Sequence, residues 1–438
     1  MRWNRFLSMP GDVYAKDRRF LADHFSEQGV MYEGKPEPFE ILPYLVPSAQ
    51  NEAIKTLFKS FHSLLEKTID LYRERPEIRQ YFNFNKAIES MVLLSCRYSP
   101  RIHICRFDYT VRDNGFPAIY ETNSACPGGL LKMSRIFGAY KRTQLYRDLC
   151  ASPGANVSAF EYYKAPVFTT ELHRLYTRAT GKTQPPVVGI LNSRHRTLTN
   201  EIGLMIDELQ SCGLRAVNAY VEDLDYKNGR LVGGGIPLDL CYQKFDDDLS
   251  CDYPFTPDTR SAVKYINALR DGSVVGVNSF ASTYLVESKA VLGLYWDPRF
   301  EGYFTGEEID LARRITARTE LLPLPHDAKL GEYMAKKDSL VLKCSLDTRG
   351  RSVVIGRETP QDVWEKFLKQ DRTNAAAPYV VQEFHPHEQY EGSELKARYV
   401  SHAYFVVAGN PVGMFTRISE SSVTNVGKCG KTGISFIV

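Results

Sequence analysis

A predicted β-hairpin at residues 106–123 constrains the fold of this 438-residue chain more than any other segment. Two runs rich in aromatic and β-branched residues, "RFDYTV" and "FPAIYETN", flank Asp113-Asn114-Gly115, which is a strong hairpin-turn signal. With Asn114 and Gly115 as the loop, Asp113 pairs with Phe116, and the numbers of cross-strand partners sum to 229. The segment therefore predicts two antiparallel strands in a defined register.

This register places four polar side chains on one face of the hairpin. Asp108 lies opposite Glu121 and Arg106 lies opposite Asn123, because side chains alternate along a strand. Two opposed carboxylates repel each other, so we expect a positive group between them. Carboxylate and amide oxygens suit Mg²⁺, and the planar fork of Arg106 suits a phosphoryl oxygen. Spacing alone also allows a surface hairpin with an Arg–Asp pair and solvated acids.

Composition excludes several classes of protein. Lys and Arg number 55 and Asp and Glu 52, so the net charge of +3 gives no reason to expect nucleic acid or membrane as a partner. No apolar run approaches the ~20 residues of a spanning helix, and the N-terminal segment lacks the apolar core of a signal peptide. The 9 cysteines show no CxxC pair or zinc spacing, which is typical of reduced thiols. We therefore expect a cytoplasmic location.

The hydrophobic pattern divides the chain into four parts and predicts an α/β (α+β) fold. Residues 1–98 are predicted to be mainly helical, and residues 99–180 to hold the hairpin and further helices. Within residues 181–275, the buried run "VVGILN", the helical "TNEIGLMIDELQSCG" and the strand "RAVNAYVEDL" predict a βαβ unit of a substrate domain. Residues 276–438 combine a lysine-bearing helix with strands and a basic loop, as a nucleotide-binding region would.

One lysine in this last part is a candidate for binding phosphate, and a second stands at the start of a helix. Lys343 ends a strand before a basic loop with Gly350 and Arg351, which can hold phosphates by charge and by backbone N–H groups. Lys289 stands at the start of a helix in "YLVESKAVLGLYW". Taken alone, the first segment is also compatible with an ordinary hairpin and the second with a solvated helix end.

Two further segments carry polar residues beside strands. Gln382 and Glu383 end the strand "YVVQEF", where they can face a purine amino group, although a partly exposed strand end is the simpler alternative. Late in the chain, "GMFTRISESSVTNVGKCGKTG" brings basic and amide side chains near glycines, namely Arg417, Asn425 and Lys428.

In their order along the chain, these segments resemble the circularly permuted ATP-grasp ligases, the group that includes glutathionylspermidine synthase. The resemblance rests on "RFDY…YETNSACPGG", "VESKAVLGLYW", "LVLKCSLDTRGRSVVIG", "YVVQEF" and "FTRIS…VTNVG", and it covers roughly residues 100–438. In an ordinary ATP-grasp chain the metal-binding acids follow the nucleotide lysines, whereas here they precede them. The resemblance thus implies an ATP-grasp fold with a circularly permuted element order, preceded by a helical N-terminal region.

The resemblance also implies a role for each candidate residue, with ATP and one or two Mg²⁺ ions as cofactors. Asp108, Glu121 and Asn123 would be the Mg²⁺ ligands, and Arg106 would be the catalytic residue that faces the transferred phosphoryl group. The ATP-binding residues would be Lys289, Lys343, Gly350, Arg351, Gln382 and Glu383. The positive group between the two carboxylates would then be Mg²⁺ carrying ATP.

The chain departs from the family in two places. Cys344 stands where the family usually has Pro, and Gly350 is the clear glycine of the loop, so Arg349 or Arg351 would take over part of the phosphate contact. The bifunctional members carry a Cys-dependent amidase domain, for which this chain has no room. Cys105 and Cys126 are therefore interpreted as structural.

The implied activity is an ATP-dependent carboxylate–amine ligase that forms an amide through an acyl phosphate. Its substrates would be a small amino acid, a peptide or a polyamine. One alternative passes the acyl group to the thiol of an acyl-carrier protein, and another, of a different class, is an inactive nucleotide-binding scaffold. The sequence does not identify the substrates. It does not identify a general base either, because His103, the candidate near the hairpin, is interpreted as structural.

Overall fold

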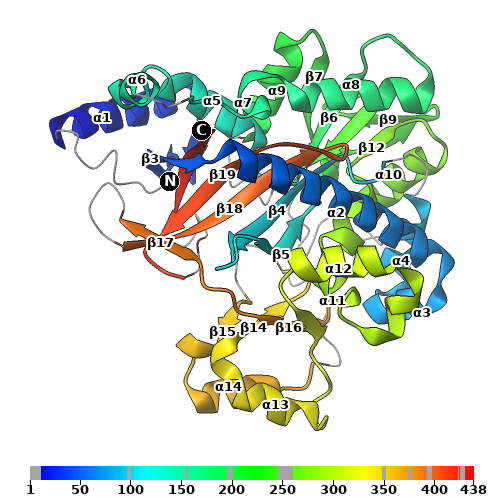
Figure 1. Cartoon of the computed structure of the whole chain (residues 1–438). Coiled ribbons are helices and arrows are strands. Elements are labelled where there is room, and N and C mark those ends of the chain that lie inside the picture. Colours follow the sequence, from blue (N-terminus) through cyan, green and yellow to red (C-terminus); the bar gives the residue numbers. More distant parts are fainter. Residues whose placement is uncertain are drawn as a thin grey trace.

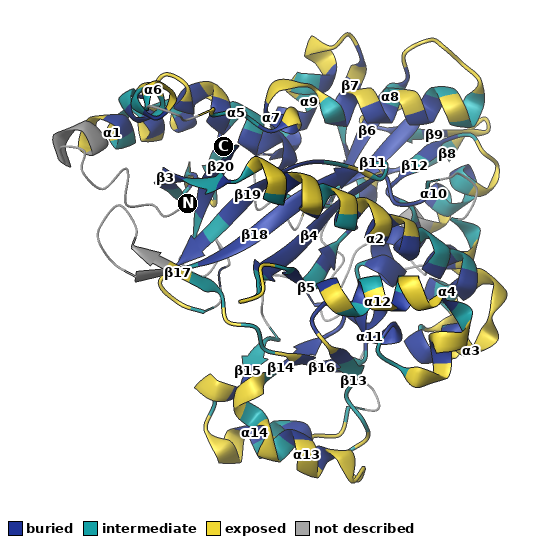
Figure 2. Cartoon of the chain, in the orientation of Figure 1, coloured by how far each residue is buried: buried dark blue, intermediate teal, exposed yellow. Residues whose placement is uncertain are grey.

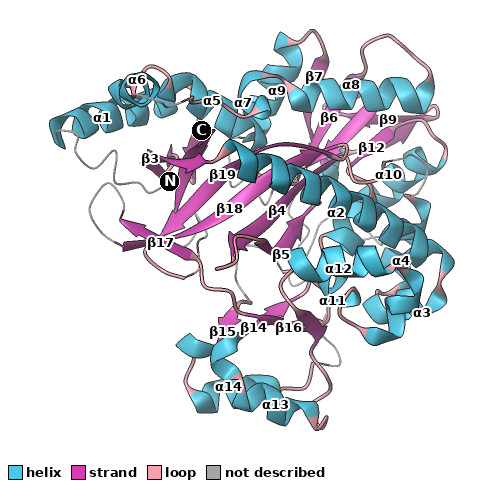
Figure 3. Cartoon of the chain, viewed as in Figure 1, coloured by secondary structure: helices cyan, strands magenta, loops and turns pink. Residues whose placement is uncertain are grey.

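The computed structural model describes residues 11–95, 100–152, 156–194, 201–244, 260–347, 352–372, 377–391, 397–422, 424 and 430–438. The fold is mixed α/β, with helices packed around several separate sheets (Figure 1, Figure 3). Strands that lie inside the molecule are largely buried, while the outer faces of the helices are exposed (Figure 2). None of the described helices is long and apolar enough to cross a membrane.

The largest sheet draws its strands from distant parts of the chain. Its order is β3-β20-β19-β18-β4-β5, with β17 paired to β18, and only the β3–β20 pair is parallel. The strands are β3 (Phe39–Val46), β4 (Ile104–Val111), β5 (Pro117–Asn123), β17 (Glu388–Glu391), β18 (Ala397–Val407), β19 (Asn410–Ser419) and β20 (Lys431–Ile437). The region expected to be mainly helical therefore also supplies a strand of this sheet.

Helix α2 (Ser48–Glu74) covers one face of the large sheet (Figure 1). Its Phe58 makes edge-to-face contacts with Phe107, Tyr109 and Tyr404, at ring-centroid distances of 5.3, 5.3 and 5.5 Å. The remaining helices of the first 180 residues are α1 (Gly11–Glu27), α3 (Pro76–Phe82), α4 (Lys86–Leu94), α5 (Leu130–Tyr140), α6 (Gln144–Ala151), α7 (Glu161–Lys164) and α8 (Val167–Thr180).

A parallel sheet with the order β12-β11-β6-β7 forms a second unit. It comprises β6 (Val187–Asn192), β7 (Arg215–Tyr220), β11 (Leu240–Gln243) and β12 (Val275–Val277), with α9 (Glu201–Ser211) between its first two strands and α10 (Arg260–Arg270) before the last. The β6–α9–β7 segment is the expected βαβ unit. Beside it lies a small antiparallel sheet of β8 (Asp225–Lys227), β9 (Arg230–Gly233) and β10 (Ile236–Pro237).

A third sheet, β13-β16-β14-β15, projects from the body of the molecule together with two helices (Figure 1). Its strands are β13 (Thr319–Leu321), β14 (Leu340–Cys344), β15 (Val354–Ile355) and β16 (Tyr379–Glu383), and the helices are α13 (Lys329–Ala335) and α14 (Gln361–Leu368). Trp364, Leu342 and Val381 belong to a small core separate from the main one. Helices α11 (Ala290–Leu294) and α12 (Gly306–Ile315) lie in the sequence between the last strand of the second sheet and the first strand of the third.

The register of the β4–β5 hairpin agrees with the sequence prediction where the polar residues lie. Arg106 pairs with Asn123 and Asp108 pairs with Glu121. Nearer the turn, Tyr109 pairs with Ile119, which lowers the sum of partner numbers by one.

The expected two-residue loop is wrong, and a β-bulge compensates for the error. Arg112 and Phe116 close a three-residue loop, because Gly115 adopts a left-handed φ of 82°. The extra residue is offset at Tyr120, which bulges out of the ladder between Asp108 and Tyr109. The bulge restores the pairing of the polar residues.

Candidate functional site

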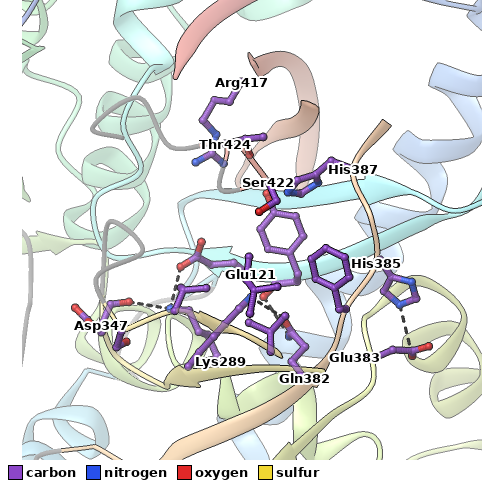
Figure 4. Close-up of a pocket in the computed structure, with 17 residues that line it drawn as sticks. Glu121, Lys289, Asp347, Gln382, Glu383, His385, His387, Arg417, Ser422 and Thr424 are labelled. Atoms are coloured by element: carbon purple, nitrogen blue, oxygen red, sulfur yellow. Dashed lines mark hydrogen bonds and ion pairs between the residues drawn. The ribbon is translucent and has the colours of Figure 1, made fainter. Parts of the chain in front are cut away.

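A cavity of about 110 Å³ lies between the large sheet and the third sheet (Figure 4). The hairpin strand β5 and strand β19 line one side, and β14, β15 and β16 line the other. The charged side chains in its wall are Glu121, Lys289, Lys343, Asp347, Glu383 and Arg417. Residues that are far apart in the sequence, such as Glu121 and Arg417, therefore meet here.

Lys289 links the hairpin to the end of β14. A π-helix at Ala281–Val286 and the start of α11 hold it, and its Nζ lies 2.9 Å from Glu121 Oε1 and 2.8 Å from the carbonyl oxygen of Asp347 (Figure 4). Burial opposes both charges, but their mutual attraction outweighs it. The pKa of Lys289 is raised and that of Glu121 is lowered, so both stay ionised.

Lys343 is the second cation of the cavity, and its environment differs. Its Nζ donates to Gln382 Oε1 at 2.6 Å and lies 5.0 Å from the centroid of the Tyr120 ring. Among the described residues, no carboxylate lies within ion-pair distance of it. Burial lowers the pKa of Lys343 to about 8, with Lys289 adding to the effect and Glu121 opposing it. This ammonium is therefore poorly neutralised.

Gln382 connects the two sheets that form the cavity. Its Nε2 donates to the carbonyl oxygen of Tyr120 at 3.2 Å and to Thr319 Oγ1 at 2.9 Å, while its Oε1 accepts from Lys343. The bulge at Tyr120 thus has a partner in the third sheet. All three contacts engage a side chain that is 1% exposed, so the amide is fixed in orientation.

Asp108 accepts hydrogen bonds from three side chains. Arg106 donates from Nε to Oδ1 at 2.7 Å and from Nη2 to Oδ2 at 3.0 Å, and Asn123 Nδ2 donates to Oδ2 at 3.0 Å. Arg417 Nη2 also contacts Oδ2. Burial alone would raise the pKa of Asp108, but the two arginines outweigh it and lower this pKa. The positive charge facing Asp108 comes from these side chains.

The hairpin offers an incomplete set of ligands for a magnesium ion. Glu121 keeps one carboxylate oxygen and Asn123 keeps its amide oxygen, and no described donor contacts either atom. Mg²⁺ is commonly held by one or two carboxylates together with substrate phosphates, so these two residues fit it, and Asp347 lies in the same wall. Both oxygens of Asp108 are occupied. Across the described part of the chain, no group of three His, Cys, Asp or Glu side chains could hold a metal.

Several predicted residues meet in the cavity and others lie outside it. Glu121, Lys289, Lys343, Gln382 and Glu383 line it. Arg106, Asp108 and Asn123 are not in its wall, although Asp108 contacts Arg417, which is. Gly350 and Arg351, like Arg349, Asn425 and Lys428, fall outside the described residues. The roles of all these residues remain predictions.

Sequence reasoning missed the residues that hold the loop after the hairpin. Glu287 accepts from the backbone N–H groups of Ser124 and Ala125, the latter at 2.9 Å. Burial raises the pKa of Glu287 to about 7, even though these two N–H groups oppose the shift. Glu287 stands only two positions before Lys289, but nothing in that spacing indicates a contact with residue 124 or 125.

A buried ion pair holds the other end of the same loop. Lys244 Nζ lies 3.1 Å from Glu201 Oε2 and donates to the carbonyl oxygen of Cys126 at 3.0 Å. Glu201 Oε1 accepts from the backbone N–H of Gly129 at 2.8 Å. Because Glu201 begins α9 and Lys244 follows β11, the parallel sheet fixes this loop. Sequence alone shows no pattern that would pair them.

Comparison with known proteins shows the fold. No family model matches the chain, and a search of curated proteins finds no match. Among solved structures, the chain is similar to the apo form of a glutathione synthetase-like effector, GSS30, from Globodera pallida, with a TM-score of 0.64, 11% identity, and coverage of 99% of this chain and 98% of that one. A weaker match is the ATP-grasp ligase PsnB in complex with a minimal precursor, with a TM-score of 0.29, 10% identity and coverage of 57% and 90%. The mixed α/β fold is thus shared with the glutathione synthetase-like effector.

Proposed function

We propose that this protein is an ATP-dependent carboxylate–amine ligase of the circularly permuted ATP-grasp type, and that the cavity binds the phosphates of ATP. The observation that carries the proposal is the state of Lys343. Its ammonium is buried, and among the described residues its hydrogen-bond partner is the neutral amide of Gln382. A buried cation without a counter-charge is costly, and a phosphate would supply that charge.

Two other cations lie around the same space. Lys289 lines the cavity beside Glu121, and Arg417 enters from the opposite side (Figure 4). The Nε of Arg417 is buried and has no hydrogen-bond partner among the described residues. A phosphate chain between Lys343 and Arg417 would satisfy both. Val341, Ile355 and Phe384 form an apolar part of the wall that suits a nucleobase near Glu383.

Magnesium would be held by Glu121 and Asn123, together with phosphate oxygens. When bound, it would neutralise charge on the phosphoryl group that is transferred. The side chains of the protein would position the nucleotide and stabilise the same charge, with Lys289 and Lys343 from one side and Arg417 from the other. Arg106 would act next to Arg417, through the carboxylate of Asp108 that both contact.

The reaction that this arrangement supports has two steps. An oxygen of the substrate carboxylate attacks the γ-phosphorus, and ADP leaves with the electron pair of the broken P–O bond. The nitrogen of an amine then attacks the acyl carbon, loses a proton, and displaces phosphate to give the amide. Burial and nearby cations lower the pKa of His387, in the cavity wall, to about 3, so this imidazole is neutral and too weak a base to deprotonate the amine.

One observation favours a second candidate function, an inactive nucleotide-binding scaffold. Asp108, predicted as a metal ligand, has both carboxylate oxygens occupied by side-chain donors. A metal site reduced to two ligands would bind nucleotide but catalyse poorly. Transfer to a carrier-protein thiol has no such structural support and remains an alternative acceptor for the same acyl phosphate.

The proposal is tested by Mg²⁺-dependent release of ADP and phosphate from ATP, with a panel of amino acids, dipeptides, polyamines and acyl-carrier proteins. A ligase sustains ADP release over many turnovers when both a carboxylate and an acceptor are present, and mass spectrometry detects the amide or thioester. A scaffold binds ATP in calorimetry and releases nothing with any pair. Absence of both binding and release would refute both candidate functions.

A further inference from the structure

Asp108 is the most enclosed acid of the hairpin, and its geometry differs from that of Glu121. Its side chain is 0% exposed, whereas the side chain of Glu121 is 22% exposed and lines the cavity. Arg106 grips Asp108 through two parallel hydrogen bonds, and Arg417 and Asn123 both donate to Oδ2. Two guanidinium groups therefore share one carboxylate.

The second arginine connects this buried carboxylate to the cavity. Arg417 uses Nη2 for Asp108, and its side chain, 14% exposed, reaches the cavity wall. Its buried Nε is left without a hydrogen-bond partner in the described part of the chain, and Figure 4 shows the side chain directed toward Thr424 above the cavity. The remaining guanidinium nitrogen of Arg106, Nη1, donates instead to the carbonyl oxygen of Gly128 at 2.8 Å.

We propose that Asp108 is a positioning residue that clamps Arg106 and Arg417 and holds Arg417 toward the cavity, and that it is not a ligand of the metal. The role of the clamp in the cavity rests on the proposed ligase function, whereas the contacts that form the clamp do not. Oδ2 of Asp108 already accepts from Arg106, Asn123 and Arg417, and Oδ1 accepts from Arg106, so a metal ion at Asp108 would have to share Oδ1 with Arg106 or displace a donor from Oδ2. In the described part of the chain, Glu121 and Asn123 each keep a side-chain oxygen without a hydrogen-bond donor, so a metal ion there would displace nothing.

The clamp predicts a specific effect on the protein without metal. If the contacts with Arg106 and Arg417 did not stabilise the fold, Asp108→Asn would leave the stability in EDTA unchanged, or raise it by removing repulsion from Glu121. If Asp108 is a clamp, the same change leaves two guanidinium groups facing each other without a counter-charge. Removing one partner of a buried ion pair is strongly destabilising.

The first test is thermal unfolding in EDTA without nucleotide. The clamp predicts that Asp108→Asn lowers Tm by roughly 5 °C or more, and that adding Arg417→Gln restores part of this loss. Glu121→Gln is the matched control at the opposed position. An unchanged or raised Tm for Asp108→Asn overturns the clamp. If the single variant fails to fold, the double variant decides, because a folded double variant supports the clamp and an unfolded one overturns it.

The second test measures binding of ADP by calorimetry over a range of Mg²⁺ concentrations. The clamp predicts that Asp108→Asn leaves the Mg²⁺ concentration for half-maximal ADP binding within about twofold of the parent, whereas Glu121→Gln raises it roughly tenfold or more. An equal rise in both variants would make Asp108 a metal ligand. If the parent binds no ADP, the proposed function fails, and the unfolding test still decides the clamp by itself.

Discussion

Lys343 on β14 and Gln382 on β16 are joined by a hydrogen bond of 2.6 Å, and the Gln382 amide continues to the carbonyl oxygen of the bulged Tyr120 on β5. One side chain therefore couples the third sheet, the hairpin and the poorly neutralised ammonium of the cavity. The first two predictions follow from this relationship.

Lys343→Met should weaken nucleotide binding. The change keeps an unbranched side chain that is one atom shorter and removes the buried positive charge that we propose binds phosphate, so the Kd for MgATP should rise by about 10- to 100-fold. Isothermal titration calorimetry measures it. Lys336→Met is the control, since Lys336 is exposed and pairs with Glu332 on α13. Equal affinities of the parent and Lys343→Met would remove Lys343 from the nucleotide site.

Gln382→Glu should compete with phosphate for Lys343. The new carboxylate would form an ion pair with the ammonium and raise its pKa above the present value of about 8. We expect ATP affinity to fall by about tenfold. Gln382→Met removes the hydrogen bonds without adding charge, so it should lower Tm but reduce ATP affinity less than Gln382→Glu does. Tighter ATP binding by Gln382→Glu would contradict this role.

The sequence was sufficient for the central part of the hairpin but not for its bulge. Alternation and the turn residues predict the pairing of Asp108 with Glu121 from local properties, and the pairing is observed because the bulge offsets a loop one residue longer than predicted. The carbonyl oxygen of the bulged Tyr120 accepts from Gln382, which lies in another sheet, so no local pattern contains this contact.

Long-range pairing also explains the other omissions. Strand β3 lies in a region predicted to be mainly helical, and its partner β20 is at the opposite end of the chain. Likewise, the resemblance implies that Lys289 contacts ATP, but its ion pair with Glu121 could only come from the fold. The sequence indicates which residues carry chemistry, and the topology decides which of them meet.

Arg106→Lys should separate turnover from nucleotide binding. Lysine keeps the charge but cannot make the paired hydrogen bonds to Asp108 together with the one to Gly128. Because Arg106 is not in the cavity wall, ATP affinity should change little. The kcat should fall by about two to four powers of ten, or roughly 3–5 kcal/mol of transition-state stabilisation. Lost ATP affinity with preserved kcat at saturation would show that Arg106 serves the ground state.

Glu287 should make stability depend on pH. Burial raises its pKa in the folded protein from 4.5 to about 7, so the folded state retains a proton that the unfolded chain loses. The stabilisation from this proton is therefore present below pH 4.5 and is lost as pH rises through 7.

Glu287→Gln lacks this titration. Relative to the parent, its free energy of unfolding should rise by on the order of 1–3 kcal/mol between pH 4.5 and pH 8, as measured by urea unfolding without nucleotide or Mg²⁺. Asp271→Asn is a control at an exposed carboxylate. Parallel stability curves for Glu287→Gln and the parent would show that Glu287 titrates normally.

The most direct measurement follows oxygen from the substrate into phosphate. With any carboxylate that supports ADP release, labelled with ¹⁸O in both carboxyl oxygens, an acyl phosphate requires that one ¹⁸O leaves with each phosphate when the acceptor attacks the acyl carbon. Mass spectrometry of the released phosphate should therefore show one labelled oxygen per molecule, and the amide should retain the other. Phosphate that carries no ¹⁸O from the substrate, and takes its new oxygen from water instead, would mean that the protein hydrolyses ATP without activating a carboxylate.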